Sequence, residues 1–360
     1  MKYLLPIFKP ILYFFSLIYG LVVNVRNFLF DYHLLPSQEF DIPVIAVGNI
    51  TVGGTGKTPH TEYILQLLSK DFHVAMLSRG YKRTTKGFQS GDEHATAATI
   101  GDEPFQMKRK FPNVVVAVDA DRRRGIEQII RQNAAHPVDV IVLDDAYQHR
   151  FVQPSLNILI IDSHRLITED ALLPYGRLRE PARNKKRADI VIVSKCDKGL
   201  SPIDYKLIQK KLTLLPYQTL YFTTYGYGAL YPLFPEQAGA ATLTTQELKS
   251  LSLLVVTGIA SPVDMHQFLD AHAARINKMI LPDHYAFKEK DYQLIAQEFA
   301  KLDGDKRIVV TEKDAARLFT DILLPDDLKP LIYVLPINVE FIKNQAQLFN
   351  RQISSYVTKN

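Results

Sequence analysis

A glycine-rich loop lies between an apolar run and a helical segment, and few folds accommodate that order. Residues 41–47 are apolar and rich in β-branched side chains, which predicts a buried strand. Residues 48–58 then read Gly-Asn-Ile-Thr-Val-Gly-Gly-Thr-Gly-Lys-Thr, and residues 61–70 carry apolar side chains at helical spacing. A strand, a glycine loop ending in Gly-Lys-Thr and a helix form the context of a phosphate-binding P-loop.

In such a loop the glycines let backbone N–H groups face phosphate oxygens, and the helix start adds partial positive charge. Lys57 is expected to reach the β- and γ-phosphates of a bound nucleotide, and the Thr58 hydroxyl to bind Mg²⁺. The usual pattern begins with glycine where this chain has Thr51, so a glycine turn that binds nothing is the alternative. The predicted nucleotide contacts are Thr51, Val52, Gly53, Gly54, Thr55, Gly56, Lys57 and Thr58.

Two pairs of acids are candidates for the metal and for proton transfer. Asp144 and Asp145 end the apolar run 138–143, and an acid at the end of a strand beside a P-loop holds Mg²⁺ directly or through water. A strand-end turn or helix cap is the alternative. Asp102 and Glu103 precede Pro104, so they either only start a helix, with Pro104 as its first residue, or place carboxylates near the γ-phosphate.

Arginines follow another apolar run, residues 114–118. Arg122, Arg123 and Arg124 lie beyond its carboxyl end, the edge at which doubly wound proteins bind their ligands. Arginine at that edge can stabilise the charge of phosphoryl transfer, and a solvated run of charge is the alternative.

Apolar runs alternate with helical stretches along most of the chain. This order predicts an α/β fold of P-loop NTPase type: a doubly wound, mainly parallel sheet, a second smaller α/β domain and an N-terminal membrane-associated helix. Beyond 41–47, strands are predicted at 74–77, 114–118, 140–143, 157–162, 189–194, 253–259, 277–281, 307–311 and 331–336. The predicted divisions are the N-terminal helix at 1–30, the P-loop domain at 31–212, the second domain with extended linking strands at 213–338, and a C-terminal helix at 339–360.

The first thirty residues differ from the rest in composition. Their only charges are Lys2, Lys9 and Arg26, and residues 10–25 carry none. As a helix, that uncharged run is about 24 Å long, against roughly 30 Å of membrane hydrocarbon. We favour an anchor that lies in the membrane interface with cations at its edge; a single span and a buried helix of a soluble core remain open.

Composition excludes several other classes of protein. Hydrophobic residues make up 47% and charged residues 22%, which excludes a largely disordered chain. One cysteine excludes a disulfide scaffold and multi-cysteine metal sites. A net charge of +5 favours an anionic partner: a nucleotide, a nucleic acid or an acidic lipid surface. Basic runs such as 183–187 are short and typical of solvated surface, so no nucleic acid is predicted.

Taken in order, these motifs resemble the tetraacyldisaccharide 4′-kinase (lipid A 4′-kinase) family along nearly the whole chain. The resemblance includes the Thr at position 51, which that family tolerates. It is carried by the hydrophobic basic N-terminus and by residues 48–59, 78–81 (Ser-Arg-Gly-Tyr), 101–104 (Gly-Asp-Glu-Pro), 143–149, 173–181 and 311–315 (Thr-Glu-Lys-Asp-Ala).

The resemblance implies ATP-dependent, Mg²⁺-assisted phosphorylation of the 4′-hydroxyl of a tetraacylated glucosamine disaccharide 1-phosphate, in lipid A biosynthesis. It implies a monotopic or peripheral enzyme on the cytoplasmic face of the bacterial inner membrane, with no obligate protein partner evident. Residue by residue, it implies catalytic roles for Asp102 as base, His284 as its partner, Lys57, Arg122 and Arg179; metal roles for Thr58, Glu103, Asp144 and Asp145; and substrate contacts for Tyr81 and Gln148. Asp102 and Glu103 could instead both be metal ligands.

Two alternatives belong to other classes. Ser194-Lys195-Cys196-Asp197 is similar to the Asn-Lys-x-Asp motif that reads guanine, which would suit a regulatory GTPase or a metallocofactor-insertion NTPase. Ser replaces Asn there, and no Asp-x-x-Gly follows Asp144. A membrane-tethered scaffold that binds ATP without turnover is the non-enzymatic alternative.

Overall fold

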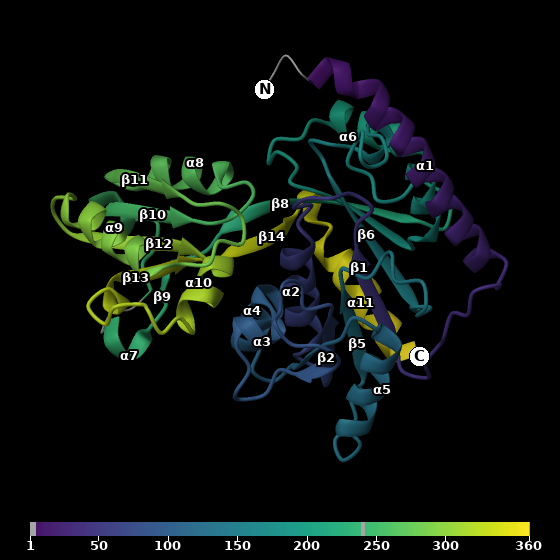
Figure 1. Ribbon diagram of the computed structural model, residues 1–360, viewed down its shortest axis with the longest axis horizontal. Helices are drawn as coiled ribbons and strands as arrows, with labels where there is room; N and C mark the ends of the chain where they lie inside the picture. Colours follow the sequence, from purple (N-terminus) through teal and green to yellow (C-terminus); the bar gives the residue numbers. More distant parts are fainter. Residues whose placement is uncertain (1–4, 239–241, 360) are drawn as a thin grey trace.

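Two sheets lie side by side and are joined by the strands β8 (Thr219–Tyr227) and β14 (Ile337–Phe341) (Figure 1). The computed structural model describes residues 5–238 and 242–359. Residues 1–4 of the predicted N-terminal segment, with Lys2, lie outside this range. The helices are α1 (Leu5–Asp31), α2 (Lys57–Leu68), α3 (Ala97–Ile100), α4 (Asp102–Lys110), α5 (Arg122–Gln132), α6 (Pro202–Leu212), α7 (Pro235–Ala238), α8 (Val263–His272), α9 (Glu289–Ala300), α10 (Glu312–Phe319) and α11 (Ala346–Lys359).

The larger sheet has nine strands in the order β14-β8-β7-β6-β1-β5-β2-β4-β3. All neighbours pair in parallel except at the two edges, where β14 and β3 run antiparallel to their partners. Its strands are β1 (Val44–Gly48), β2 (Val74–Ser78), β3 (Gln89–Ser90), β4 (Val115–Val118), β5 (Val140–Asp144), β6 (Leu156–Asp162), β7 (Ile190–Ser194), β8 (Thr219–Tyr227) and β14 (Ile337–Phe341).

Helices cover both faces of this sheet because side chains of its strands alternate between two cores. Ile45 and Val47 of β1 pack with Ile64 of α2 and Ile353 of α11, whereas the intervening β1 side chains pack with α5 on the other face. The predicted doubly wound, mainly parallel fold is confirmed.

The smaller sheet has five strands in the order β11-β10-β12-β13-β9, antiparallel only at β9. Helices α9 and α10 cover one face and α8 the other. The strands are β9 (Tyr231–Pro232), β10 (Ser252–Thr257), β11 (Arg275–Ile280), β12 (Lys306–Thr311) and β13 (Ile332–Leu335). This is the predicted second, smaller α/β unit.

The C-terminal helix is present, but its predicted start at residue 339 is wrong. Residues 337–341 form β14, which pairs antiparallel with β8 from Ile337↔Tyr227 to Phe341↔Thr223. Side chains along β14 alternate, so Val339 is buried while its neighbours are not. The helix α11 begins only at Ala346, after Lys343 and Asn344 adopt positive φ. The alternation of buried and exposed side chains is typical of a strand. The left-handed residues Lys343 and Asn344 separate that strand from the helix that follows.

Helix α4 also begins earlier than its proline suggests. It starts at Asp102, so Pro104 is its third residue rather than its first. Gly101 precedes it with φ +95°, a conformation that lets α3 end and α4 begin at one residue. Asp102 and Glu103 therefore lie in the first turn of α4 and do not cap it.

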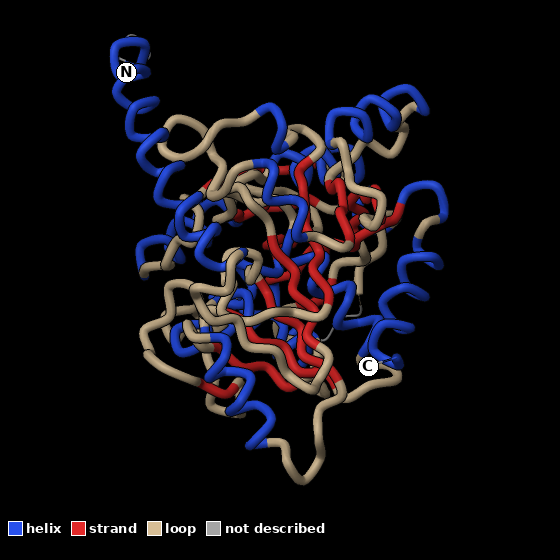
Figure 2. Tube along the Cα trace, turned by 90° about the vertical axis from the view of Figure 1, so that its right-hand side faces the viewer, coloured by secondary structure: helices blue, strands red, loops and turns tan. Residues whose placement is uncertain are grey.

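Helix α1 lies along the larger domain with one face docked and the other exposed, and its N-terminal end projects past the body (Figures 1 and 2). On the docked face Ser16 donates to the Leu172 carbonyl at 2.9 Å, and Asn27 donates to Glu180 at 3.2 Å. On the outer face Leu21 and Val22 are 65% and 61% exposed. A buried core helix is therefore excluded, and the stretch Lys9–Asp31 is long and apolar enough to qualify as a candidate membrane span.

Candidate active site

The glycine loop connects the carboxyl end of β1 to the start of α2, and hydrogen bonds at Thr55 fix its conformation. Asn49 donates its side-chain amide to the Thr55 hydroxyl at 2.7 Å, and Ser194 donates to the Thr55 carbonyl at 2.7 Å. No side chain caps the first turn of α2, so its N–H groups face the loop. The loop therefore offers an anion the partial positive charge of the helix start.

Gly56 cannot be replaced without distorting this loop. Its φ is +88°, and a Cβ there would collide with the Tyr225 hydroxyl. Tyr225 comes from β8, one of the two strands that join the sheets. The loop is thus fitted closely against the linking strands.

Lys57 faces the two aspartates at the end of β5. Its Nζ is 3.6 Å from Asp145 Oδ1, and Arg179 Nη1 lies 3.3 Å from the same oxygen. Burial alone would raise the pKa of Asp145, but Lys57 and Arg179 hold it below its usual range. Asp145 is therefore ionised and placed between two cations.

Asp144 is the most perturbed acid of the site. It accepts a hydrogen bond from Thr61 at 3.0 Å, and β1 places it beside Val47. Burial, followed by the nearby carboxylates Glu103 and Asp145, raises its pKa to about 7. Burial and the two neighbouring carboxylates thus both disfavour a negative charge on Asp144.

A divalent cation bound to these carboxylates would offset the repulsion between them. Within residues 5–238 and 242–359, no group of three or more His, Cys, Asp and Glu side chains forms a metal cage by itself. Mg²⁺ does not require one, because it keeps several waters and takes substrate phosphate oxygens alongside one or two carboxylates. Asp144, Asp145, Glu103 and the Thr58 hydroxyl at the start of α2 are the groups that could hold it here.

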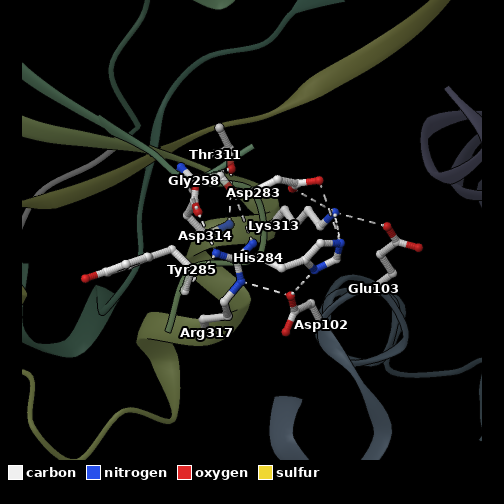
Figure 3. Close-up of polar contacts among 10 residues, drawn as sticks. All are labelled: Asp102, Glu103, Gly258, Asp283, His284, Tyr285, Thr311, Lys313, Asp314 and Arg317. Atoms are coloured by element: carbon white, nitrogen blue, oxygen red, sulfur yellow. Dashed lines mark hydrogen bonds and ion pairs between the residues drawn. The ribbon is translucent and has the colours of Figure 1, made fainter. Parts of the chain in front are cut away.

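The smaller domain brings a histidine to the first turn of α4 (Figure 3). His284 Nδ1 lies 3.1 Å from Asp102 Oδ2, although the two residues are 182 positions apart in the sequence. Burial alone would raise the pKa of Asp102, but the hydrogen bond with His284 and the charge of Arg317 lower it overall. The structure thus brings together the predicted pair, with the carboxylate ionised.

Arg122, another predicted site residue, lies near the acids at the end of β5. Arg122 is buried, and its Nη1 donates to the Asp119 carbonyl at 2.9 Å, while its Nε has no partner among the described residues. Burial lowers the pKa of Arg122 to about 10, although the negative charges of Asp144 and Asp145 act to raise it. The unpaired Nε beside the acids suits an additional anion.

Gln148 and Tyr81 lie at different depths. Gln148 donates to the Asn49 carbonyl at 2.7 Å and accepts from Arg179 at 3.3 Å, so it joins the phosphate loop to Arg179. Tyr81 is 64% exposed, and its ring meets that of His284 edge-on at 5.5 Å. Tyr81 thus lies at the mouth of the site.

Sequence reasoning missed two cations from α10. Lys313 lies 3.4 Å from Glu103, and Arg317 Nε donates to Asp102 at 2.9 Å. The motif at residues 311–315 includes Lys313 but not Arg317. The spacing of four between the two cations places them on one helix face.

A second ion bridge, next to these cations, joins the two domains. Lys110 at the end of α4 lies 2.7 Å from Glu62 of α2 and 2.7 Å from Glu312 of α10. Glu312 also accepts from the Ile337 N–H at 3.2 Å. The helix that carries Asp102 is therefore tied to both domains at its two ends.

Ser194 and Lys195, which suggested guanine recognition, support the phosphate loop instead. Besides the Ser194 bond to Thr55, Lys195 donates to the Gly54 carbonyl and lies 2.9 Å from Asp162. These side chains brace the loop from the end of β7.

His60 makes stability depend on pH. Its ring contacts the Gly56 carbonyl at 2.7 Å and the Thr223 hydroxyl at 2.9 Å, and burial lowers its pKa to about 4. The unfolded chain therefore takes up this proton first as the pH falls. We expect the free energy of unfolding to drop between about pH 6.5 and pH 4, by roughly 3 kcal/mol from this residue. Urea unfolding at a series of pH values measures it.

His60→Gln removes one titrating group and should reduce the slope of that part of the profile. The remaining slope includes His149, whose pKa burial also lowers to about 4. His94→Gln, at an exposed histidine, is the matched control and should leave the slope unchanged. Equal slopes for wild type and His60→Gln would contradict the assignment.

Comparisons with known proteins show which family the chain belongs to. The family model for tetraacyldisaccharide-1-P 4′-kinase matches residues 8–357. The chain belongs to this family. It is 52% identical over 350 residues to the tetraacyldisaccharide 4′-kinase of Phocaeicola vulgatus, covering 97% of this chain and 95% of the relative. It is 49% identical over 355 residues to the Bacteroides thetaiotaomicron protein of that name, covering 97% and 93%.

A solved structure extends the match to three dimensions. The crystal structure of LpxK from Aquifex aeolicus in complex with ATP covers 99% of this chain and 98% of its own, with 25% identity and a TM-score of 0.72. The predicted family is confirmed, and with it the class of enzyme, a kinase that phosphorylates an alcohol. The GTPase and scaffold alternatives are not supported.

Proposed function

We propose that this chain transfers the γ-phosphate of ATP to the 4′-hydroxyl of a tetraacylated glucosamine disaccharide 1-phosphate. The observation that carries the proposal is the contact between Asp102 and His284 at 3.1 Å, beside the acids that face Lys57. It places a carboxylate suited to receive a hydroxyl proton next to a site suited to nucleotide phosphates. The family assignment supplies the identity of the acceptor.

Nucleotide binding is assigned to the loop and its helix. The backbone from Thr51 to Thr58 would surround the phosphates, and Lys57 would reach the β- and γ-phosphates. Thr58, Glu103, Asp144 and Asp145 would hold Mg²⁺, which when bound supplies charge neutralisation at the transferred phosphate. Arg122 and Arg179 would contact phosphate oxygens as negative charge shifts during transfer.

The acceptor hydroxyl is assigned to Asp102. This carboxylate would take the 4′-hydroxyl proton as the oxygen attacks phosphorus, and His284 would orient it. Because His284 comes from the smaller domain, the site is complete only when the two domains are in contact, which would limit transfer of phosphate to water. Tyr81 and Gln148 would line the path of the acceptor.

Phosphate transfer from γ-labelled ATP to the tetraacyl disaccharide 1-phosphate, in detergent micelles, tests the proposal. We expect a labelled lipid product that depends on Mg²⁺ and on ATP. Folded protein that forms no labelled lipid, or that uses GTP in preference to ATP, would overturn it.

Membrane association is assigned to α1. Its docked face contacts the protein along its length, and its outer face presents apolar side chains, an arrangement that suits a helix lying in the membrane interface. We place the enzyme on the cytoplasmic face of the bacterial inner membrane, where ATP is present.

Leu21→Asp with Val22→Asp tests this anchor. Two charges on the outer face should abolish most co-sedimentation with lipid vesicles, because a buried charge costs more than the apolar contact it replaces. Ile322→Asp, at a 95% exposed isoleucine of the smaller domain, is the matched control. Unchanged sedimentation of the double variant would assign the membrane contact elsewhere.

A further inference from the structure

His284 has a hydrogen-bonding partner on each ring nitrogen, and the two partners come from different domains (Figure 3). Nδ1 lies 3.1 Å from Asp102 Oδ2 of α4, and Nε2 lies 3.0 Å from Lys313 Nζ of α10. A lysine ammonium has three donors and no acceptor. Nε2 must therefore accept from Lys313, and the ring proton is left on Nδ1, where it is donated to Asp102.

Asp102 receives two hydrogen bonds on a single oxygen. Oδ2 accepts from His284 Nδ1 and also from Arg317 Nε at 2.9 Å. Within the part of the chain that the structure describes, Oδ1 has no protein partner. The carboxylate is thus fixed through one oxygen, and the other is left for an incoming hydroxyl.

Side chains of α10 also hold the backbone around His284 in place. Asp314 accepts from the Gly258 N–H at 3.1 Å, and the Gly258 carbonyl accepts from the His284 N–H at 3.2 Å. Arg317 Nη1 is 3.1 Å from Asp314 and 3.1 Å from the Tyr285 carbonyl. This network holds His284 at φ +58°, a left-handed conformation that is uncommon for residues other than glycine.

We propose that Lys313 and Arg317 are positioning residues: Lys313 fixes His284 in its Nδ1–H tautomer, and the two cations together direct Oδ1 of Asp102 toward the acceptor hydroxyl. The proposal rests on the function proposed above. Lys313 also lies 3.4 Å from Glu103 and 3.7 Å from Asp283, so a purely structural ion pair is the competing explanation. Asp102 alone also favours a proton on Nδ1, so the separate role of Lys313 is to hold the ring with Nε2 turned away from Asp102. A purely structural pair would not affect the ring.

The first test is the tautomer itself. The full-length chain in micelles, labelled with ¹⁵N-histidine, gives ring nitrogen shifts that distinguish Nδ1–H from Nε2–H, and His284→Gln identifies the His284 signals. We expect Nδ1–H in the wild type and in Lys313→Arg. In Lys313→Met we expect a mixture of Nδ1–H and Nε2–H, because the ring can then turn and present either nitrogen to Asp102. An Nε2–H ring in the wild type, or an unchanged ring in Lys313→Met, would overturn the proposal.

Kinetics give the second test. Lys313→Met should lower kcat by about 10-fold to 100-fold, as when an orienting partner is removed, with KM for ATP unchanged within about twofold. Lys313→Arg should recover most of the loss because it restores a donor. Lys278→Met, which breaks an exposed 2.7 Å ion pair with Asp270 in the same domain, is the control and should behave as wild type.

The two proposals fail in different ways. If the wild type labels no lipid, the proposed function is wrong, and the ring nitrogen shifts still decide the role of Lys313. If lipid is labelled and Lys313→Met keeps wild-type kcat, the proposed function stands and the positioning role is rejected.

Discussion

Asp102→Asn is expected to reduce kcat for lipid phosphorylation by about 10²-fold to 10⁴-fold, the range for loss of a general base. Asparagine keeps the shape of the side chain but cannot take up the hydroxyl proton at neutral pH. Binding of ATP should be retained, because Asp102 is held by His284 and Arg317 and not by the phosphate loop. Transfer of label to lipid measures kcat, and titration of the same preparation with ATP measures the affinity for ATP.

Asp71→Asn, at an exposed aspartate just beyond α2, is the matched control and should behave as wild type. A kcat for Asp102→Asn within twofold of wild type would mean that transfer needs no base at this position. It would then favour the alternative in which Asp102 and Glu103 both serve the metal.

Lys57→Met is expected to lower kcat by about 10²-fold to 10³-fold, the usual effect of losing one charged group from a preorganised site. Methionine keeps much of the apolar length of the chain and removes the ammonium that lies 3.6 Å from Asp145. That loss leaves Arg179 as the one cation within ion-pair distance of Asp145 among the described residues. Label transfer under saturating ATP measures the effect on kcat.

Lys70→Met, at the exposed lysine after the same helix, separates this effect from a general loss of charge. A retained melting temperature for both variants shows that the fold is intact. Wild-type turnover by Lys57→Met would remove this lysine from the site.

The phosphate loop could be predicted because its information is local. A strand, a glycine turn and a helix start are written within residues 41–70, and the observed β1 and α2 follow that order. The apolar runs gave the remaining parallel strands for the same reason, since each strand is a continuous buried segment. Which strands are neighbours in the sheet depends on residues far apart in the sequence. Only the structure shows that β1 lies between β5 and β6.

Non-local pairing explains what was missed. Residues 337–341 join a strand more than a hundred positions earlier, and only that partner makes their alternation a strand rather than a helix start. Arg317 meets Asp102 across 215 positions, so nothing near Arg317 in the sequence indicates its partner. The Asp102–His284 contact came from the family resemblance, because neither residue alone distinguishes a site from a helix start or a turn.

The docking of α1 also determines how the enzyme would meet its lipid. Tyr19 donates to the Arg179 carbonyl at 2.8 Å and Arg26 to the Gln148 carbonyl at 2.8 Å, so this helix is attached directly to residues of the phosphate site. A helix so attached, lying in a bilayer, keeps the site at a fixed height above the surface. The search for the acceptor then becomes two-dimensional, and the rate should follow the mole fraction of substrate in the bilayer. Diluting that substrate with inert lipid, at constant bulk concentration, should slow the reaction.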